Sequence, residues 1–593
     1  MTGDSEARAE DALHKGILRW LYENRWEELR GIQREAIHAF QSGKNDLILT
    51  ARTAGGKTEA AFLPILSSIA DDVHGGVRAL YVGPLRALIN DQFRRLEDLC
   101  KYLNVPVHRW HGEVGVAARK RLTQEPSGIL LITPESIESL FLNRSPHLRN
   151  LFSRLEVCVI DELHVFLGTE RGQHMRSLLA RLEAVRGRRI RRIGLSATLA
   201  RPEEAAAWIC REDPGRVAIL SDDSRGSEFK TQILGYRSQS TEEDGERLSE
   251  IANEGALVDD LVRHHESGTA LVFANSRRQV EETATETREW YEEHGWRTDR
   301  VLVHHGSVGR LLREDAEEAL QKGGDKLCFC TSTLELGLDI GDVSAVAHVG
   351  APFQAASAAQ RIGRSGRRPG APVVFRQYVA IDPSRREIDE AALFFPLLRA
   401  VAVIECYLDG WVEPVELNRF HLSTFVHQVM CTVAQHDGCA PEHLFQLLCS
   451  ENNFGWISKT SFMRLLRSMG QKELLRQMED GTLLLDREGE HWIGSREIYA
   501  VFQSTEDWSV EHQGARIGTI PLKNVLMPGD KLLLAGRKWR VVGAHDEAHV
   551  LDVEPAAQGR PAVYGGDPGD VHPELLARMR RTLENASAPP RFC

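Results

Sequence analysis

The sequence lacks any long apolar run and any paired-cysteine pattern. No window of its 593 residues approaches the ~18 consecutive apolar residues that a membrane-spanning helix needs. The N-terminal stretch, MTGDSEARAEDALHK, is polar and acidic, unlike a signal or transit peptide. The ten cysteines are scattered without CxxC pairs, so we expect reduced, mostly buried thiols instead of a disulfide framework. These absences predict a cytoplasmic protein that does not contact a membrane.

The chain also lacks an excess of positive charge. Its 73 lysines and arginines are outnumbered by 85 aspartates and glutamates, which gives a net charge of −12 with histidine neutral. A simple nucleic-acid-binding module is expected to be basic, so the overall balance disfavours that class. This exclusion is weak, because a groove lined by a few arginines, lysines and backbone N–H groups can hold a phosphate chain inside an acidic particle.

Patterns typical of strands and helices alternate along most of the chain. A length of 593 residues is too great for one core and predicts about four domains. Short apolar runs separated by amphipathic stretches fill residues 35–199, and a second series starts near Thr231, which predicts two tandem α/β domains with parallel sheets. Beyond Phe395 the pattern is helical and then gives short strands, which suits a winged helix. From Val501 onward, short strands and turns indicate a small β-rich module.

The predicted domains are therefore 1–225, 226–395, 396–500 and 501–593. In the first, the apolar runs predict strands at 46–50, 79–82, 128–132, 157–160 and 190–195. In the second, strands are predicted at TQILGY, TALVFA, TDRVLVHH, KLCFCT, AVAHVG and VVFRQYVA. In the third, GTLLLD and HWIGS are the predicted short strands.

A glycine-containing turn, ARTAGGKT at residues 51–58, links the apolar run DLILT to a helical stretch. This strand–turn–helix context is the one that a phosphate-binding loop requires. Backbone N–H groups of the loop and the helix N-terminus would form an anion cradle, Lys57 would contact the outer phosphates, and the Thr58 hydroxyl would reach Mg²⁺. The first glycine of the strict pattern is replaced by Ala51, and a chance glycine-rich turn is the alternative interpretation.

Two carboxylates, Asp161 and Glu162, follow the apolar run VCVI in the string VCVIDELH. Side chains at the carboxyl end of a parallel strand face the crevice in which nucleotides bind. There Asp161 would hold Mg²⁺ through water, and Glu162 would polarise the water that attacks the γ-phosphate. The alternative is a pair of carboxylates that cap the next helix. His164 is either an ordinary loop histidine or a hydrogen-bond partner of Ser196 or Thr198.

Eight short strings resemble, in order, the motifs of the superfamily-two helicases. They are ARTAGGKT, PLRALIND (84–91), TPES (133–136), DELH (161–164), SAT (196–198), LVFANSRRQVE (271–281), TSTLELGLDIGDV (331–343) and QRIGRSGRR (360–368). The longer strings DELHVFLGTERGQH, HHGSVGRLLRED and TSTLELGLDIGDV are most similar to the large helicase-related (Lhr) family, of the DExH-box type, here in a short core form. The segment IGTIPLKNVLMPGDKLLLAGRKWRVV is similar to that family's final core module. The resemblance implies two tandem RecA-like domains that bind ATP between them.

The same resemblance implies which residues serve ATP hydrolysis. Gln33 in RGIQREAI resembles the glutamine that reads the adenine edge, with an exposed helical residue as the alternative. Gln360 resembles the residue that contacts nucleotide or catalytic water, and Arg364 and Arg367 resemble the arginine fingers. Arginine suits that role because its planar, permanently charged fork meets two phosphate oxygens at once. At helical periodicity these three residues fall on one helix face, and an exposed basic helix is the alternative.

The implied sites are as follows. The predicted catalytic residues are Lys57, Asp161, Glu162, Gln360, Arg364 and Arg367. The predicted ATP-binding residues are Gln33, Ala54, Gly55, Gly56, Lys57, Thr58, Gly337 and Asp339, and the predicted Mg²⁺ ligands are Thr58 and Asp161. Coupling of the ATP site to movement is assigned to His164, Ser196 and Thr198.

Contacts to nucleic acid should fall mostly on phosphates, because a motor that steps along any sequence cannot rely on base edges. For each predicted contact, an ordinary turn or helix-cap residue is the alternative interpretation. By resemblance, the predicted nucleic-acid contacts are Pro84, Arg86, Thr133, Pro134, Asn275, Ser276, Arg277, His305, Gly306, Thr331, Ser332 and Thr333.

The leading hypothesis is an ATP-dependent helicase or translocase on single-stranded DNA, moving 3′ to 5′, in DNA repair or defence against foreign DNA. An RNA or RNA:DNA hybrid helicase shares every motif. A nucleic-acid-binding subunit that uses ATP as a switch without stepping is a third hypothesis. The protein is expected to be a monomer or a small assembly.

Two further observations limit the hypothesis. Only HVGAPFQAASAA separates the motif around TSTLELGLDIGDV from QRIGRSGRR, which is too short for the strand-separating hairpin of some related DNA helicases. A histidine- and cysteine-rich stretch does not follow a standard zinc spacing, so we predict no metal there. It comprises His427, Cys431, His436, Cys439 and His443.

Overall fold

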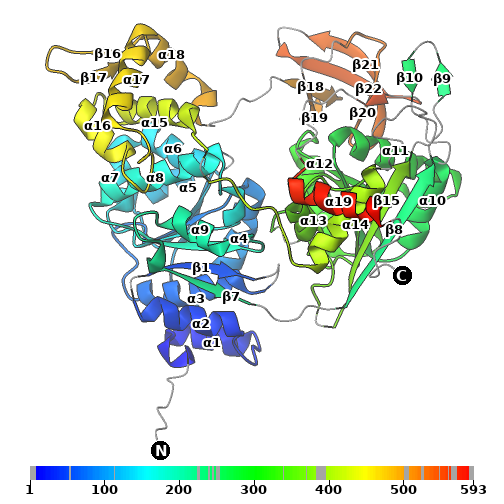
Figure 1. Ribbon diagram of the computed structural model, residues 1–593, viewed down its shortest axis with the longest axis horizontal. Helices are drawn as coiled ribbons and strands as arrows, with labels where there is room; N and C mark the ends of the chain where they lie inside the picture. The colour runs from blue at the N-terminus through cyan, green and yellow to red at the C-terminus, as the bar shows by residue number, and fades with distance from the viewer. Residues whose placement is uncertain are drawn as a thin grey trace, which may run out of the picture. The chain divides into compact units, whose positions relative to one another are not determined.

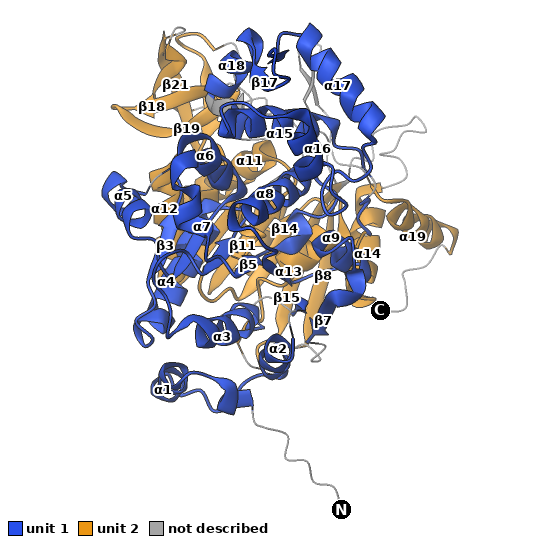
Figure 2. Cartoon of the chain, turned by 90° about the vertical axis from the view of Figure 1, so that its left-hand side faces the viewer, with its two compact units in different colours: residues 1–223, 414–504 blue, residues 224–413, 505–593 orange. Residues whose placement is uncertain are grey.

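The computed structural model forms two compact units, each built from two separate stretches of the chain (Figure 2). The first unit contains residues 1–223 and 414–504, and the second contains residues 224–413 and 505–593. The residues that the structure describes are 9–43, 45–51, 55–112, 114–222, 228–237, 241–243, 246–248, 254–337, 340–368, 370–381, 395–417, 419–499, 507–521, 526–545, 548–557, 560–561 and 571–585. Within these ranges, no helix combines the length and the apolar composition that crossing a bilayer requires.

A seven-stranded parallel sheet forms the centre of the first unit, in the order β3-β4-β2-β5-β6-β1-β7. Figure 1 labels β1 and β7 of this sheet. Its interior strands are apolar on both faces because helices cover both sides. In β1, for example, Leu47 and Leu49 pack on one side and Ile48 on the other. The strands are β1 (Asp46–Thr50), β2 (Ala79–Val82), β3 (Val107–Trp110), β4 (Ile129–Ile132), β5 (Val157–Ile160), β6 (Arg191–Ser196) and β7 (Val217–Ser221).

Two groups of helices enclose this sheet. The core on one face includes α1 (Lys15–Glu23), α2 (Gly31–Gln41), α3 (Lys57–Ile69) and α4 (Arg86–Lys101). The core on the other face includes α5 (Val116–Gln124), α6 (Pro134–Asn143), α7 (Leu148–Phe152), α8 (Glu170–Arg186) and α9 (Pro202–Ile209). Helix α8 begins where the Thr169 side chain accepts a hydrogen bond from the backbone N–H of Gly172, and it ends at Gly187, whose φ is +80°.

The five strands predicted for this region are confirmed, and two strands were missed. The missed strands, β3 and β7, are the two edges of the sheet. Both are only partly buried, and in β3 the polar residues His108 and Arg109 interrupt the apolar pattern that marks interior strands. The apolar run VAIL of β7 was not predicted as a strand.

The second unit contains a six-stranded parallel sheet in the order β12-β13-β11-β14-β15-β8. All six strings predicted as strands form this sheet, so the expectation of parallel α/β sheets is confirmed in both units. The strands are β8 (Phe229–Arg237), β11 (Thr269–Ala274), β12 (Val301–His304), β13 (Lys326–Cys330), β14 (Ala345–Val349) and β15 (Val373–Ile381). The accompanying elements are α10 (Glu254–His264), α11 (Arg277–Glu293), α12 (Arg310–Lys322), α13 (Ala355–Ile362), α14 (Phe395–Leu408) and the hairpin β9 (Thr241–Glu243) and β10 (Glu246–Leu248).

The later part of the first unit is a helical segment with one small antiparallel pair of strands. It contains α15 (Leu422–Gln435), α16 (Pro441–Leu448), α17 (Lys459–Gln471), β16 (Leu475–Gln477), β17 (Leu483–Leu485) and α18 (Arg487–Gly494). The predicted strand GTLLLD matches β17, but the strand predicted at HWIGS is wrong, because His491 to Gly494 belong to α18 and Ser495 directly follows that helix. Asp486 starts that helix by accepting a hydrogen bond from the backbone N–H of Arg487 at 2.9 Å.

The later part of the second unit is a six-stranded mixed sheet followed by one helix. Its order is β19-β18-β22-β21-β20-β23. The elements are β18 (Asp507–His512), β19 (Ala515–Pro521), β20 (Lys531–Leu534), β21 (Arg537–His545), β22 (Val550–Pro555), β23 (Arg560–Pro561) and α19 (Pro573–Glu584). The carboxylate of Glu281, on α11, accepts hydrogen bonds from the backbone N–H groups of Ala535 and Gly536 at 2.7 and 2.5 Å. This buried contact fastens the mixed sheet to the parallel one.

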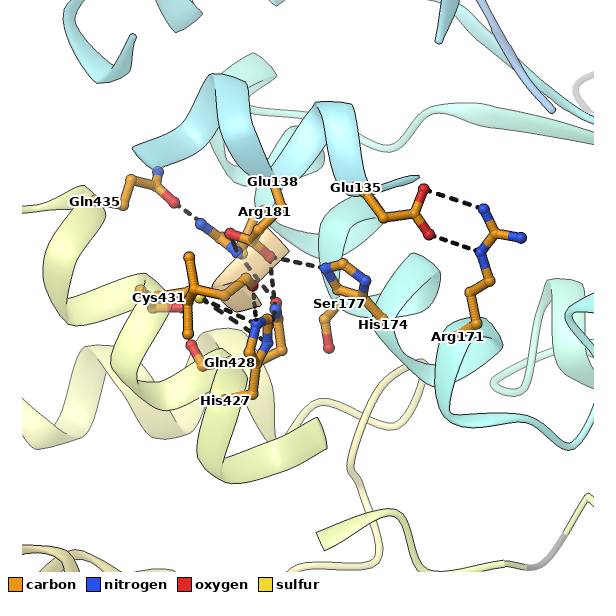
Figure 3. A network of polar contacts seen from close by, with 12 residues as sticks. Glu135, Glu138, Arg171, His174, Ser177, Arg181, His427, Gln428, Cys431 and Gln435 are labelled. Atoms are coloured by element: carbon orange, nitrogen blue, oxygen red, sulfur yellow. Dashed lines mark hydrogen bonds and ion pairs between the residues drawn. The ribbon is translucent and has the colours of Figure 1, made fainter. Parts of the chain in front are cut away.

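In the first unit, a buried polar network joins the helical segment to the parallel sheet domain (Figure 3). Glu138 on α6 is fully buried and accepts hydrogen bonds from Arg181 Nη1 on α8 at 2.7 Å and from Gln428 Nε2 on α15 at 2.7 Å. The Nε2 atom of His174, on α8, lies 2.9 Å from the same carboxylate. These partners, led by the Arg181 charge, hold the pKa of Glu138 well below its usual value despite its burial.

His427 on α15 lies beside this network. A ring nitrogen of His427, a ring nitrogen of His174 and a carboxylate oxygen of Glu138 lie within 4.8 Å of one another. The Sγ atom of Cys431 is 3.7 Å from His427 Nε2. The Glu138 carboxylate already accepts from three neighbours, so hydrogen bonds account for this cluster. All described cysteines are free thiols, and all but Cys449 are buried, as expected from the sequence.

We expect Arg181→Met to destabilise the protein by about 3–5 kcal/mol, because it leaves the buried Glu138 carboxylate without its main counter-charge. Urea denaturation followed by circular dichroism measures the free energy of unfolding. The double variant Arg181→Met/Glu138→Met should recover part of the loss, and the exposed control Arg188→Met should change stability by less than about 0.5 kcal/mol. A single variant as stable as the original chain would contradict the structural role of the pair.

Candidate active site

The loop predicted to bind phosphate joins β1 to α3 in the first unit. Gly56 precedes the helix with a φ of +78°, a conformation that favours glycine. A Cβ atom there would lie 2.5 Å from Gln33 Nε2 and would force the Gln33 side chain to move. The Nζ atom of Lys57 donates to the carbonyl oxygen of Ala51 at 2.5 Å, across the mouth of the loop. Gly55 and Thr58 flank this position, and Ala54 lies outside the described residues.

Gln33 is fully buried against this loop and is not an exposed helical residue. Its Oε1 atom accepts from the backbone N–H of Arg30 at 2.9 Å, and its Nε2 atom lies 3.4 Å from the carbonyl oxygen of Gly56. The side chain therefore lies directly beside the turn that the sequence assigns to phosphate.

The two carboxylates lie at the same edge of the sheet as this loop. Strand β6 pairs with β5 on one side and with β1 on the other, so the carboxyl ends of all three strands meet there. Asp161 directly follows β5, and its Oδ1 atom accepts from the backbone N–H of Glu162 at 2.8 Å, while the Tyr81 hydroxyl donates to Oδ2. Burial and the neighbouring Glu162 carboxylate raise the pKa of Asp161 to about 6.

Glu162 adopts a left-handed backbone conformation with a φ of +50°, which is strained for a residue with a side chain. Its carboxylate is 3.6 Å from His164 Nδ1, and that nitrogen is 3.0 Å from Ser196 Oγ. The Ser196 hydroxyl donates to the carbonyl oxygen of Thr198 at 2.9 Å, so His164 Nδ1 donates to Ser196. The structure thus brings Glu162, His164, Ser196 and Thr198 into one chain of contacts.

The oxygen donors at this edge fit Mg²⁺. Thr58 supplies a hydroxyl, and Asp161 and Glu162 supply carboxylates, which are the hard oxygen ligands that Mg²⁺ prefers. Burial and the adjacent Glu162 carboxylate both disfavour the charged form of Asp161 and so raise its pKa, and a divalent cation bound there would oppose both effects.

A second cluster of predicted residues lies in the other unit, around the end of α13. The Nε atom of Arg361 donates to Glu335 Oε1 at 2.7 Å, and Arg361 Nη1 donates to His348 Nε2. Arg364 is 2% exposed, and its Nη2 atom donates to the carbonyl oxygen of Glu335 at 2.5 Å. Arg361, Glu335 and His348 were not singled out from the sequence, because their pairing depends on three separate strand and helix ends.

The prediction that Gln360, Arg364 and Arg367 share one helix face is wrong. Helix α13 ends at Ile362, and Gly363 follows with backbone dihedrals outside the helix, so only Gln360 is helical. Arg364 lies in the turn beyond, and Gly366 has a φ of +67° before the half-buried Arg367. Gly337 is half-buried after the short turn that follows β13, and Asp339 lies outside the described residues.

In the first unit, the residues predicted to contact nucleic acid stand at the starts of α4 and α6. Arg86 is exposed at the first position of α4, whereas Pro84, Thr133 and Pro134 are buried around the two helix starts. The sequence reading missed Arg171, which donates to the carbonyl oxygen of Pro84 at 2.7 Å and forms a bidentate pair with Glu135.

The second unit holds the remaining predicted contacts at the carboxyl ends of β11, β12 and β13. Ser276 caps α11 by accepting from the Gln279 N–H, and Arg277 Nη1 donates to Ser307 Oγ at 2.9 Å. Asn275 Nδ2 donates to the carbonyl oxygen of Ala351 at 2.8 Å.

Around β12 and β13, exposure differs sharply between neighbours. Gly306 and Ser332 are exposed, Thr331 is half-buried, and Thr333 donates to the carbonyl oxygen of His304 at 3.0 Å. The ring of His305 is fully buried, with Nε2 2.7 Å from the Glu281 carboxylate that also holds the mixed sheet. The His305 side chain is therefore part of the packing between the two sheets of this unit.

Two family models match this chain, one within each of the regions that form the parallel sheets. Residues 30–206 match the family model described as DEAD/DEAH box helicase, and residues 254–369 match the helicase conserved C-terminal domain. An ATP-dependent helicase Lhr-Core from Sulfolobus acidocaldarius is 30% identical over 92% of this chain and 62% of its own length. One from Methanocaldococcus jannaschii is 32% identical over 61% of this chain and 43% of its own length.

The chain belongs to the superfamily-two helicases and is Lhr-like. A solved structure of Mycobacterium smegmatis helicase Lhr, bound to ssDNA and AMP-PNP, has a TM-score of 0.69 and 25% identity over 82% of this chain and 62% of that one. The two parallel sheets are accordingly RecA-like domains. The resemblance read from the eight motifs is confirmed, and the chain spans only about half of the length of these Lhr relatives.

We expect acid to destabilise the second RecA-like domain through His348. This fully buried histidine donates from Nδ1 to the Gly350 carbonyl and accepts from Arg361 at Nε2, so it must be neutral, and burial holds its pKa well below 6.5. The unfolded chain binds the extra proton below pH 6.5, so stability falls as the pH drops below that value, by at most about 1.4 kcal/mol per pH unit.

Thermal unfolding at pH 7.5 and 5.5 measures this effect. His348→Gln, which keeps an acceptor but does not titrate, should show a smaller loss of Tm on acidification than the original chain. The exposed His147→Gln serves as the matched control and should behave like the original chain. Equal acid sensitivity in the His348 variant would contradict the assignment.

Proposed function

We propose that this protein is an ATP-dependent translocase or helicase that moves on single-stranded DNA. The observation that carries the proposal is the convergence of the Lys57 loop and the Asp161–Glu162 pair at one edge of the first RecA-like sheet. This edge supplies a cation for phosphate, carboxylates for a divalent ion and a base for water within one small region.

In this proposal, backbone N–H groups of Ala54, Gly55 and Gly56 and the start of α3 cradle the phosphates of ATP. Lys57 neutralises the outer phosphates, and Gln33 binds the adenine edge. Thr58 and Asp161 hold Mg²⁺, which supplies charge neutralisation when bound. Glu162 accepts a proton from the attacking water, and its strained backbone fixes the direction of the carboxylate.

The second RecA-like domain contributes the remaining catalytic groups. We assign Arg364 and Arg367 to stabilising charge on the transferred phosphoryl group, Gln360 to contacting the nucleotide or water, and Gly337 and Asp339 to the ribose and triphosphate side. Because these groups and Lys57 belong to different domains, ATP binds most tightly when both engage it, and hydrolysis weakens that engagement. The chain of contacts from Glu162 through His164 to Ser196 and Thr198 carries the change toward the nucleic-acid side.

The strand is held mainly through its phosphates. We assign this to Pro84, Arg86, Thr133, Pro134, Asn275, Ser276, Arg277, Gly306, Thr331, Ser332 and Thr333, with His305 acting through its backbone. The ssDNA in the Mycobacterium smegmatis Lhr structure supports DNA over RNA as the strand. The family resemblance supports 3′ to 5′ movement, a cytoplasmic location and a role in DNA repair or defence.

We further propose that residues 396–500 form a winged helix and residues 501–593 a small β-rich Lhr-type module, after RecA-like domains at 1–225 and 226–395. The helical segment with its single antiparallel pair β16–β17 supports the former, and the six-stranded mixed sheet supports the latter. We also propose that the protein acts as a monomer or a small assembly.

The first test removes the loop lysine. Lys57→Ala should lower the DNA-stimulated ATPase rate on the order of 100-fold or more, because the outer phosphates lose their cation. The exposed Lys120→Ala removes the same charge elsewhere on this domain and should leave the rate unchanged. An ATPase rate indifferent to single-stranded DNA, or unchanged in Lys57→Ala, would refute the proposal.

The second test concerns movement and substrate. A 3′ to 5′ translocase should displace streptavidin from a 5′-biotinylated DNA strand in an ATP-dependent way, and much more slowly from a 3′-biotinylated one. Glu162→Gln should bind the strand without displacing streptavidin, because it holds ATP but lacks the base. Matched DNA, hybrid and RNA duplexes distinguish the substrates. Activity on RNA alone would replace DNA as the track, and ATP turnover without displacement would favour an ATP-switched binding subunit.

A further inference from the structure

A cavity of about 220 Å³ lies in the first unit, and none of the residues that line it is used in the ATP proposal. It is formed by the start of α8, the end of α9 and the segment that leads into α15. The polar and aromatic residues that line it are Thr169, Gln173, Arg176, Trp208, Arg211 and His421. The lining thus contains two arginines and a histidine, and none of the described residues that form it is an acid.

Arg176 is the unusual member of this lining. It is 7% exposed, its Nε atom donates to the carbonyl oxygen of Asn452 at 2.9 Å, and its buried Nη2 atom has no hydrogen-bond partner among the described residues. Burial, together with the charges of Arg192 and Arg211, lowers the pKa of Arg176 to about 9. A buried guanidinium that faces other cations and lacks a carboxylate is costly to the free protein, so it calls for an anionic partner.

Asn452 links Arg211 to Arg176. Asn452 accepts from Arg176 through its carbonyl oxygen and from the backbone N–H of Arg211 through Oδ1 at 2.9 Å. The carboxylate of Glu170, which follows Thr169 in the chain, accepts from the Ser423 hydroxyl at 2.6 Å. Asn452 therefore fixes the Arg176 side chain and the backbone from which the Arg211 side chain projects at the same cavity.

We propose that this cavity binds a phosphate group through Arg176 and Arg211. Two guanidinium groups in one cavity suit the paired oxygens of phosphate, and Trp208, Ala207 and Leu417 give the cavity an apolar wall on which a nucleotide sugar or base packs. The cavity is large enough for a phosphate with part of a nucleoside. The phosphate belongs either to a free nucleotide or inorganic ion, or to the nucleic-acid strand, and only the strand source rests on the proposed function.

A matched pair at Ala207, on α9, tests the proposal without disturbing either arginine. Ala207→Glu places a carboxylate at the cavity, and Ala207→Gln places a neutral group of the same size there. Thermal unfolding is followed against inorganic phosphate and, separately, against adenosine monophosphate. Phosphate binding at the Lys57 loop is common to both variants, so it cancels in the comparison.

We expect Ala207→Gln to respond to phosphate nearly as the original chain does, and Ala207→Glu to require at least about tenfold more phosphate for the same shift in Tm. Arg211→Gln should weaken binding similarly, whereas Arg149→Gln, an exposed arginine on α7 outside the lining, should not. If the two Ala207 variants respond equally to phosphate, the proposal is overturned, whatever the ATPase result.

A second arm identifies the source of the phosphate. If the strand occupies the cavity, an oligothymidylate will compete with phosphate, and Arg211→Gln will reduce the slope of log affinity against log salt by about one. If a free ion or nucleotide is the ligand, the oligothymidylate will not compete and the slope will not change. This arm measures equilibrium binding, so its result is independent of whether the protein hydrolyses ATP or moves.

Discussion

The pairing of β6 between β5 and β1 is the constraint on which the proposed ATP site depends. Residues Thr50 and Ser196 are paired at the ends of β1 and β6, and the Ala51 N–H donates to the Ser196 carbonyl at 3.3 Å just beyond them. Since β5 runs parallel on the other side of β6, Asp161 emerges at the same edge. A reversal of β1 or β5 would separate the lysine loop from the carboxylates, and a reversal of β6 would remove Ser196 and Thr198 from this edge.

Buried carboxylates perform a second structural task in both units. Glu138 receives donors from Arg181 on the sheet domain and from Gln428 on the helical segment, and Glu281 receives backbone donors from the mixed sheet. Each carboxylate is fully buried, so separating the partners would expose an unpaired charge or leave it unsatisfied.

The sequence predicts most of the sheet framework and part of the site, for identifiable reasons. Interior strands such as β1 and β5 are apolar on both faces and stand out, whereas the edge strand β3 is interrupted by His108 and Arg109. Periodicity failed at α18, where the cap at Asp486 overrides a strand-like composition, and beyond Gly363, where the chain leaves the helix.

What sequence reasoning could not supply is the set of partners. The hydrogen bonds from Arg361 to His348 and from Arg181 to Glu138 join residues on different elements. Neither the residue types nor their spacing in the sequence predicts these pairs. The scarcity of acidic side chains around Arg176 also results from the fold and cannot be predicted from the sequence. The net charge of −12 is likewise a poor guide to the local potential at Arg176. Glu138, Glu281 and Asp161 are buried and held by internal donors, so these carboxylates contribute little to the field outside the protein.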